Sequence, residues 1–293
     1  MRVAVARLLR EIRAAISNLN PNEVRRTAER PLAVRLVSSS AGGYAVMEDF
    51  LAPPSVSHEK RMDLVQMLHR AEDPGVPARF DLVLYDSHLP YRENAFPFDS
   101  YRPQRTVQEV LLRKQELGLA LARHFPPFRR PVVDRVIQTI AKENTLFALA
   151  TALPNIVPHL IELPWAVGEF ASDTAFLTVN QVRMAFLIAA ASDSPVGYRE
   201  QKAEIASIVA GAVGWRALAR ELVGKVPFGG GLIPKGAIAY AGTYVVGLGL
   251  EKYHRIGYGL TRTERLEAYE AALKDGSNVT GMLLAGLKKL DAA

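Results

Sequence analysis

The sequence predicts two domains of different classes, a small α/β region followed by a larger all-α domain. The chain has 293 residues, about twice the usual length of one domain. Short apolar runs typical of buried strands stand at residues 32–37 and 80–85, with a Gly-rich turn and a helical stretch between them. From residue 131 onward the apolar residues follow the helical period, and no convincing strand is found.

The composition is typical of a packed globular protein. Hydrophobic residues make up 49% of the chain and charged residues 23%, which argues against disorder. There is no cysteine, which excludes disulfides, zinc–thiolate sites, iron–sulfur clusters and cysteine nucleophiles. The first twenty residues include Arg7, Arg10, Glu11 and Arg13, so they lack the continuous apolar core of a signal peptide. We therefore expect a cytoplasmic protein.

The net charge of +6 is concentrated near the start of the sequence. Residues 1–30 hold seven Lys or Arg against three Asp or Glu, whereas residues 31–125 hold eleven against twelve. Residues 126–293 hold eighteen against fifteen. No basic strip interleaved with aromatic residues is present, so nucleic acid is not an expected partner.

Residues 1–30 are predicted to form an amphipathic helix over 2–19 and a linker. One narrow stripe of that helix is apolar, and it consists of Val5, Leu8, Leu9, Ile12, Ile16 and Leu19. Arg7, Arg10 and Arg13 lie together on another side. Two interpretations are open: the helix packs on the body of the protein with its arginines in water, or it lies on an anionic membrane surface.

Residues 31–125 are predicted to form the α/β region. The strand at 32–37 is followed by a Gly-rich turn and a helix that Pro53-Pro54 ends. A second helix is expected at 57–71 before the strand at 80–85, a loop at 86–105 and a helix at 106–124. Strand, turn, helix and strand together indicate a βαβ unit with a parallel sheet.

The turn after the first predicted strand has the glycines of a phosphate-binding loop without its charged group. A P-loop reads G-x-x-x-x-G-K-[ST], with Lys for the phosphates and the hydroxyl for magnesium. Here the loop residues are Ser38, Ser39, Ser40, Ala41, Gly42 and Gly43, and neither Lys nor Ser or Thr follows. Asp86 ends the second strand, where α/β folds place functional carboxylates. These residues form a candidate vestigial nucleotide site; no catalytic residue, metal site or cofactor is expected.

Residues 126–293 are predicted to be entirely helical. The expected helices cover residues 131–153, 178–192, 198–224, 235–253, 262–274 and 278–290. Thr261 and Glu264 have the spacing of a capping box at the start of the fifth helix, and Gly276 is placed to end it.

Small residues dominate the predicted helix at 235–253. Gly236, Ala239, Gly242 and Gly247 are among those that leave it nearly free of side-chain bulk, and residues 208–214 could supply a facing small surface. A small-residue helical hairpin is therefore expected. It could be a central helix pair in water or could dock in lipid. Residues 145–161, 174–192 and 236–250 are the most apolar stretches, but each is too short or too polar for a clean membrane span.

Residues from about 126 to 258 resemble the YcjF-like domain of unknown function found C-terminal to Era-like GTPase domains. The most specific matches are LTVNQVRMAF and AIAYAGTYVVGLG. The resemblance implies a helical, often membrane-associated module without known catalytic residues. The segment 31–125 then stands where that architecture has its GTPase domain. It lacks the P-loop lysine and the guanine-specificity signature Asn-Lys-x-Asp, and it is shorter than a full GTPase domain.

These observations predict a non-catalytic interaction protein, a pseudo-GTPase that contacts the cytoplasmic face of the inner membrane, peripherally or integrally, or a protein partner. The candidate contact residues are Arg7, Arg10, Arg13, Gly236, Ala239, Gly242 and Gly247. One alternative is a GTPase-related switch protein that binds nucleotide weakly. Another is a soluble helical homo-oligomer that self-associates through residues 236–250.

Overall fold

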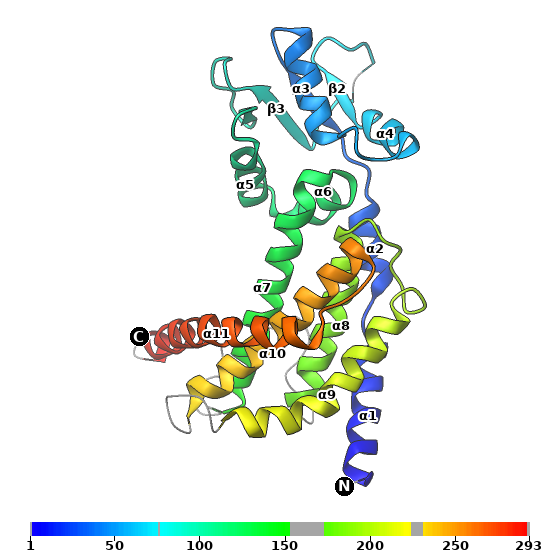
Figure 1. Ribbon diagram of the computed structural model, residues 1–293. Coiled ribbons are helices and arrows are strands. Elements are labelled where there is room, and N and C mark those ends of the chain that lie inside the picture. The colour runs from blue at the N-terminus through cyan, green and yellow to red at the C-terminus, as the bar shows by residue number, and fades with distance from the viewer. Residues whose placement is uncertain (1, 76, 153–172, 224–230, 292–293) are drawn as a thin grey trace. The chain divides into compact units, whose positions relative to one another are not determined.

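The computed structural model describes residues 2–75, 77–152, 173–223 and 231–291 (Figure 1). Its contacts divide the chain into two compact units. The α/β unit comprises Glu23–Asp134 and Ala190–Pro195, and the helical unit comprises Met1–Asn22, Arg135–Ala189 and Val196–Ala293. The N-terminal helix therefore belongs to the helical unit, and the α/β unit starts before and ends after the region 31–125 expected from the sequence.

The α/β unit is built on a four-stranded parallel sheet with the strand order β2-β1-β3-β4. Its strands are β1 (Val34–Val37), β2 (Leu68–Arg70), β3 (Leu82–Asp86) and β4 (Phe96–Phe98). Strand β1 is central, with Val34 opposite both Leu68 of β2 and Leu82 of β3. The fold is thus mixed α/β with a helical majority, as the sequence predicts at this coarse level.

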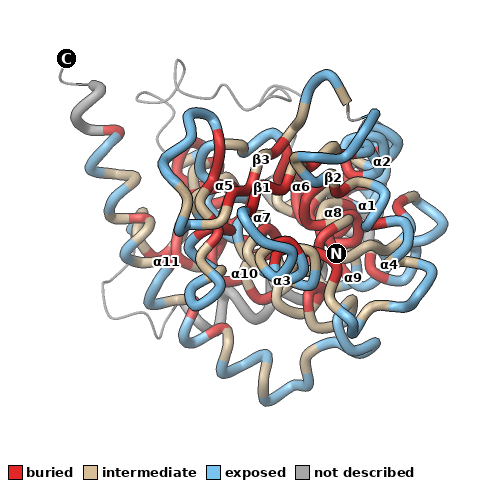
Figure 2. The backbone as a smooth tube through the Cα atoms, turned by 90° about the horizontal axis from the view of Figure 1, so that it is seen from above, coloured by how far each residue is buried: buried red, intermediate tan, exposed pale blue. Residues whose placement is uncertain are grey.

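The helices of the α/β unit precede, separate and follow these strands along the chain. They are α2 (Pro21–Glu29), α3 (Ala41–Leu51), α4 (His58–Val65), α5 (Pro103–Arg113) and α6 (Gly118–His124), with the 3-10 turn η1 (Gln115–Leu117) before α6. Helix α3 packs on β1, α4 on β2 and α5 on β4. Leu36 and Leu84 of the two central strands are fully buried. Figure 2 shows red, buried segments at β1 and β3.

Two strands were not expected from the sequence. The helix predicted at 57–71 ends at Val65, and residues 68–70 form β2 instead. Strand β4 lies inside the predicted loop 86–105. Each is only three residues long, and β4 contains Pro97. Such short segments carry no alternating pattern of their own, so their conformation comes from pairing with β1 and β3.

The helical unit is formed by α1 (Arg2–Ser17), α7 (Pro126–Ala150) from Arg135 onward, α8 (Asp173–Ala191) up to Ala189, α9 (Lys202–Val223), α10 (Leu232–Ile256) and α11 (Arg262–Asp291). No strand occurs after residue 131 in the described part of the chain, as expected. The predicted capping box begins α11: the Thr261 N–H donates to Glu264 Oε2 at 2.8 Å and the Glu264 N–H donates to Thr261 Oγ1 at 3.3 Å.

Helix α10 packs mainly against α11 and touches α9 much less, so the hairpin expected with residues 208–214 is not its main contact. Gly276 does not end a helix, because α11 continues unbroken to Asp291. A Cβ on Gly276 would lie 2.9 Å from the Ala237 carbonyl oxygen and 3.0 Å from Tyr240 Cβ. Gly276 is therefore the point where the backbones of α10 and α11 approach closely.

One described helix is long and apolar enough to cross a membrane, the segment Thr174–Ala191 with a mean hydropathy of 1.3. In the structure 78% of this segment is buried inside the protein. Core helices of soluble proteins have the same length and composition, and this burial is what such a core helix shows.

Candidate functional site

The best candidate site in the α/β unit lies at the carboxyl ends of β1 and β3. Chain connections run to opposite sides of β1, so β1 and β3 flank the switch point where parallel sheets bind ligands. Ser38 follows β1 and Asp86 ends β3. Both side chains reach Gly43: a Cβ there would collide with Ser38 Oγ and lie 3.1 Å from Asp86 Oδ2. The structure thus brings together three residues that the sequence singled out.

The side-chain hydroxyls of Ser38 and Ser40 accept hydrogen bonds from two backbone N–H groups of this loop. The Gly43 N–H donates to Ser40 Oγ at 3.1 Å, which makes Ser40 the N-cap of α3. The Ser40 N–H donates to Ser38 Oγ at 3.3 Å. A P-loop needs such amides to bind phosphate oxygens, and here they have internal acceptors.

The Asp86 carboxylate brings negative charge to the N-terminal end of α3. Its Oδ1 accepts a hydrogen bond from the His88 N–H at 3.1 Å, and its Oδ2 lies beside Gly43. A carboxylate there is stabilised by the helix dipole. The same carboxylate repels a phosphate that approaches this end of the helix.

The two residues after Gly43 are Tyr44 and Ala45, which are neither the lysine nor the Ser or Thr of a P-loop. Tyr44 is buried, and its hydroxyl donates to Glu72 Oε1 at 3.1 Å. Ala45 has no hydroxyl for magnesium. Arg70 lies with its guanidinium 5.4 Å from the Tyr44 ring centre, but Glu48 binds it through hydrogen bonds of 2.7 and 3.0 Å. The hydrogen bonds and the charge of Glu48 raise the pKa of Arg70.

The remaining residues of the predicted loop are open. Ser39 and Gly42 are exposed, and nothing lies within 4 Å of a Cβ placed on Gly42. They take no part in the contacts among Ser38, Ser40, Gly43 and Asp86. In the described part of the chain no group of three or more His, Asp or Glu residues could hold a metal ion.

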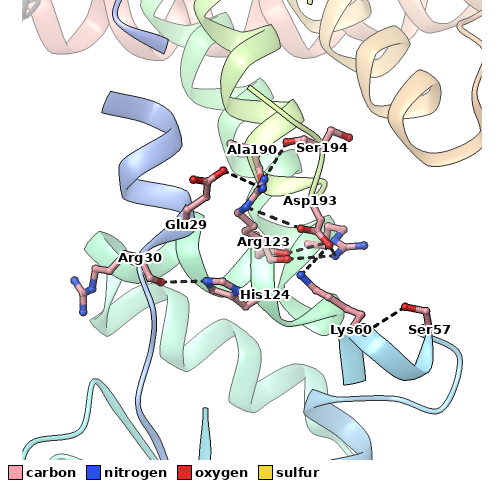
Figure 3. A network of polar contacts seen from close by, with 11 residues as sticks. Glu29, Arg30, Ser57, Lys60, Arg123, His124, Ala190, Asp193 and Ser194 are labelled. Carbon is pink, nitrogen blue, oxygen red and sulfur yellow. Dashed lines mark hydrogen bonds and ion pairs between the residues drawn. The ribbon is translucent and has the colours of Figure 1, made fainter. Parts of the chain in front are cut away.

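A second polar cluster of the α/β unit gave no signal in the sequence (Figure 3). Asp193 has a left-handed backbone with φ 60°, and its carboxylate is approached by three cations. Lys60 Nζ is 3.0 Å away, an Arg129 nitrogen 3.8 Å and Arg123 Nε 3.9 Å. Arg123 also donates to the Ser194 carbonyl at 2.9 Å. These contacts hold residues 190–195 on the α/β unit, which explains why they belong to it.

His124 lies beside this cluster in Figure 3. Its Nε2 is 3.1 Å from the Arg30 carbonyl oxygen, and its buried Nδ1 has no hydrogen-bond partner among the described residues. Burial lowers the pKa of His124. A neutral imidazole in this position holds residue 30 to the end of α6.

The helical unit has a buried polar network that joins side chains of α7, α8 and α10. Asn180 of LTVNQVRMAF donates to Asn144 Oδ1 at 2.9 Å, and the Asn144 amide donates to Thr243 Oγ1 at 2.8 Å. Gln181 donates to the same hydroxyl at 3.4 Å. Arg183 pairs with Glu143 at 2.8 Å. These bonds fix α7, α8 and α10 to one another, because a buried amide is costly unless it is paired.

The small residues of α10 are used inside the helical unit. Gly236, Ala239, Gly242 and Gly247 are all buried. A Cβ on Gly236 would lie 2.6 Å from Thr280 of α11, and one on Gly247 would lie 2.7 Å from Ile137 of α7. The close packing that this spacing predicts therefore occurs within the unit, and these residues form no exposed face.

The N-terminal helix has its apolar stripe only partly covered, with Leu9 of the stripe 39% exposed, and its arginines are exposed. Leu8, Ile12 and Ile16 are buried, and α1 packs against α9. The Tyr198 hydroxyl lies 2.7 Å from the Ile16 carbonyl oxygen and 2.6 Å from that of Leu19, which caps the end of the helix. Arg7, Arg10 and Arg13 are exposed. Of the two interpretations of this helix, its packing on the protein body is the one that the buried Leu8, Ile12 and Ile16 support.

A comparison with known protein families, curated proteins and solved structures found no match for this chain.

Proposed function

We propose that this protein is a non-catalytic interaction protein in which a GTPase-like α/β unit has lost nucleotide chemistry and is joined to a helical module of the YcjF-like type. The observation that carries the proposal is the set of side chains around Gly43. Ser38 and Ser40 accept the loop amides, and Asp86 puts a carboxylate where a phosphate would approach. Tyr44 replaces the lysine that would neutralise a triphosphate.

Isothermal titration calorimetry with GTP, GDP and ATP in the presence of Mg²⁺ tests the loss of nucleotide chemistry. We expect no saturable heat at millimolar nucleotide. Saturable binding with one site per chain, together with GTP turnover at an ordinary enzymatic rate of about 1 s⁻¹ or more, would contradict the proposal. Saturable binding without turnover would favour the alternative of a nucleotide-binding switch.

For the partner we propose the anionic cytoplasmic face of the inner membrane, contacted peripherally by the arginine side of α1. Arg7, Arg10 and Arg13 are exposed, whereas only Leu9 of the described stripe residues is exposed, which favours contact mainly by charge. Each basic residue near an anionic surface contributes about 1 kcal/mol, so binding should be weak and sensitive to salt.

Flotation with phosphatidylserine vesicles at low salt tests this contact. The wild type should float, and the variant with Arg7, Arg10 and Arg13 changed to Glu should not. The matched control changes the exposed Arg79, Arg92 and Arg105 to Glu, which alters the net charge equally. Equal flotation of the two variants would show that net charge alone drives binding. No flotation of the wild type would point to a protein partner instead.

A further inference from the structure

A pocket of about 310 Å³ opens within the helical unit. Residues of α8, α9, α10 and the start of α11 line it, and the segment between the last two helices closes one side. Its volume is at the lower end of the range that small-molecule sites occupy. The pocket wall contains a buried charge.

Glu204 of α9 is the buried charged residue of the pocket wall, with 8% of its surface exposed. His254 lies beside it, with its Nε2 3.7 Å from Glu204 Oε1. No N–H or O–H group of the described residues donates a hydrogen bond to the Glu204 carboxylate. Burial lowers the pKa of His254, so near neutral pH the imidazole carries no charge to compensate Glu204.

A buried carboxylate without a cation is costly, and proteins normally pair it. Arg265 also lines the pocket, but it is exposed, and its guanidinium donates to the Leu260 carbonyl at 3.4 Å. It therefore stands at the rim. Glu204 stands in the first turn of α9, where the helix dipole partly stabilises a carboxylate, and it lines the cavity without a paired cation among the described lining residues.

The rest of the wall is mainly apolar with a few polar groups. Ile208, Val245 and Leu250 supply buried hydrocarbon surface. Gln181 lines the pocket too, with its amide held by Thr243 of the buried network. Tyr253 lines the pocket and is 41% exposed, so its ring is open to a cation. Hydrocarbon walls around one carboxylate suit a ligand with an apolar body and one positive charge.

We propose that this pocket binds a small organic cation, an ammonium group on an apolar body, with the ammonium against Glu204. An anion would be repelled by that carboxylate, and a neutral ligand would leave it uncompensated. A metal ion is a poor match, because no group of three or more His, Asp or Glu residues in the described part of the chain could bind one.

The test uses three probes of similar shape: 2-phenylethylammonium, 2-phenylethanol and 3-phenylpropionate. Each is titrated into the full-length protein by calorimetry at neutral pH. We expect the ammonium compound to bind at least about tenfold more tightly than the alcohol, since a desolvated charge pair contributes more than 1.4 kcal/mol. The propionate should not bind measurably.

Two variants locate the binding to this pocket. Glu204→Gln keeps the shape of the side chain and should remove the preference for the ammonium probe over the alcohol. Gly249→Leu should block both probes, because Gly249 lines the pocket and a Cβ on it meets only Leu260, at 4.0 Å. The matched control is Glu267→Gln on the exposed surface of α11, which should bind like the wild type.

Equal affinity of the wild type for the ammonium compound and the alcohol would overturn the proposal, as would a preference that survives Glu204→Gln. Failure of all three probes to bind would overturn it as well. If Glu204→Gln fails to fold, as judged by circular dichroism, two measurements still test the proposal. They are the comparison of the three probes on the wild type and the binding of the probes to Gly249→Leu. The outcome is independent of nucleotide binding by the α/β unit.

Discussion

Gly43 lies where the turn after β1, the N-terminus of α3 and the end of β3 meet. It has no side chain, so Ser38 Oγ and Asp86 Oδ2 can both approach its Cα. Its neighbour Gly42 has open space around it although it stands in the same helical turn. A side chain is therefore excluded by close contacts at Gly43 but not at Gly42. The two positions form a matched pair for mutation.

Gly43→Ala should destabilise the protein by about 1–3 kcal/mol, because the new methyl group overlaps Ser38 Oγ and forces the turn to move. Gly42→Ala should be neutral or stabilising by up to about 1 kcal/mol, since it adds helix propensity without a clash. Urea unfolding of both variants measures this difference. Equal free energies of unfolding would show that the turn accommodates a Cβ at either position.

Part of the candidate site could be predicted from single residues and part could not. Ser38, Gly43 and Asp86 follow from the position of a turn and a strand end, which are local features. The contacts Tyr44–Glu72 and Arg70–Glu48 join residues 28 and 22 positions apart. No local pattern specifies such pairs, because they depend on how β2 lies beside β1.

Helix α11 combines one feature that was predicted correctly and one that was not. The capping box at Thr261 and Glu264 lies within four residues, so the sequence is sufficient to specify it. Gly276 was expected to end the helix, as glycine commonly does. Instead it lies in the middle of α11, where the missing side chain lets α10 come close. Only the folded chain shows this contact.

Gly276→Ala should lower the free energy of unfolding by about 1–3 kcal/mol, because the new Cβ would lie 2.9 Å from the Ala237 carbonyl oxygen in the wild-type geometry. Gly281→Ala, on the same helix with nothing within 4 Å, should raise it by about 0.5–1 kcal/mol. Thermal and urea unfolding of both variants test the prediction. Stabilisation by both substitutions would mean that α10 and α11 are not in close contact at Gly276.

The acid sensitivity of α11 depends on Glu264. Hydrogen bonds from Lys252 and from Thr261 lower the pKa of Glu264 to about 2. Since the folded-state pKa lies below the ordinary value of 4.5, the stabilisation is complete above 4.5 and is lost as the pH falls toward 2. We therefore expect the wild type to exceed Glu264→Gln in stability at pH 6, and the difference to shrink by pH 3.

Unfolding curves of the wild type and Glu264→Gln between pH 6 and pH 3 measure this effect. Glu267→Gln is the control, because this glutamate is exposed on the same helix outside the capping box. A difference between Glu264→Gln and the wild type that stays constant over this pH range would contradict the lowered pKa.

At the scale of the whole molecule, the chain passes between its two units more than once. Residues 190–195 belong to the α/β unit although the residues on either side belong to the helical unit. The ion pairs of Asp193 with Lys60, Arg123 and Arg129 hold these residues in the α/β unit. Its left-handed backbone is one that Asn also tolerates, so the charge can be removed without adding strain.

Asp193→Asn should loosen the α/β unit, because three cations lose the carboxylate between them. Amide hydrogen exchange should become faster in α4 and α6, and rates in α10 and α11 should not change. Asp63→Asn, an exposed acidic residue of α4 with the same change of charge, is the control. Faster exchange throughout both units, or in neither, would contradict the role assigned to Asp193.

The sequence by itself determined the mixed fold class, the amphipathic first helix, the capping box of α11 and the lack of a P-loop lysine and hydroxyl residue after β1. All of these depend on residues within a few positions of one another, so composition, periodicity and short motifs are enough. The tertiary structure alone decided the strands β2 and β4, the partner of α10, the cations around Asp193 and the pocket at Glu204. These arise from contacts between distant segments, whose energies depend on packing and pairing that no local pattern encodes.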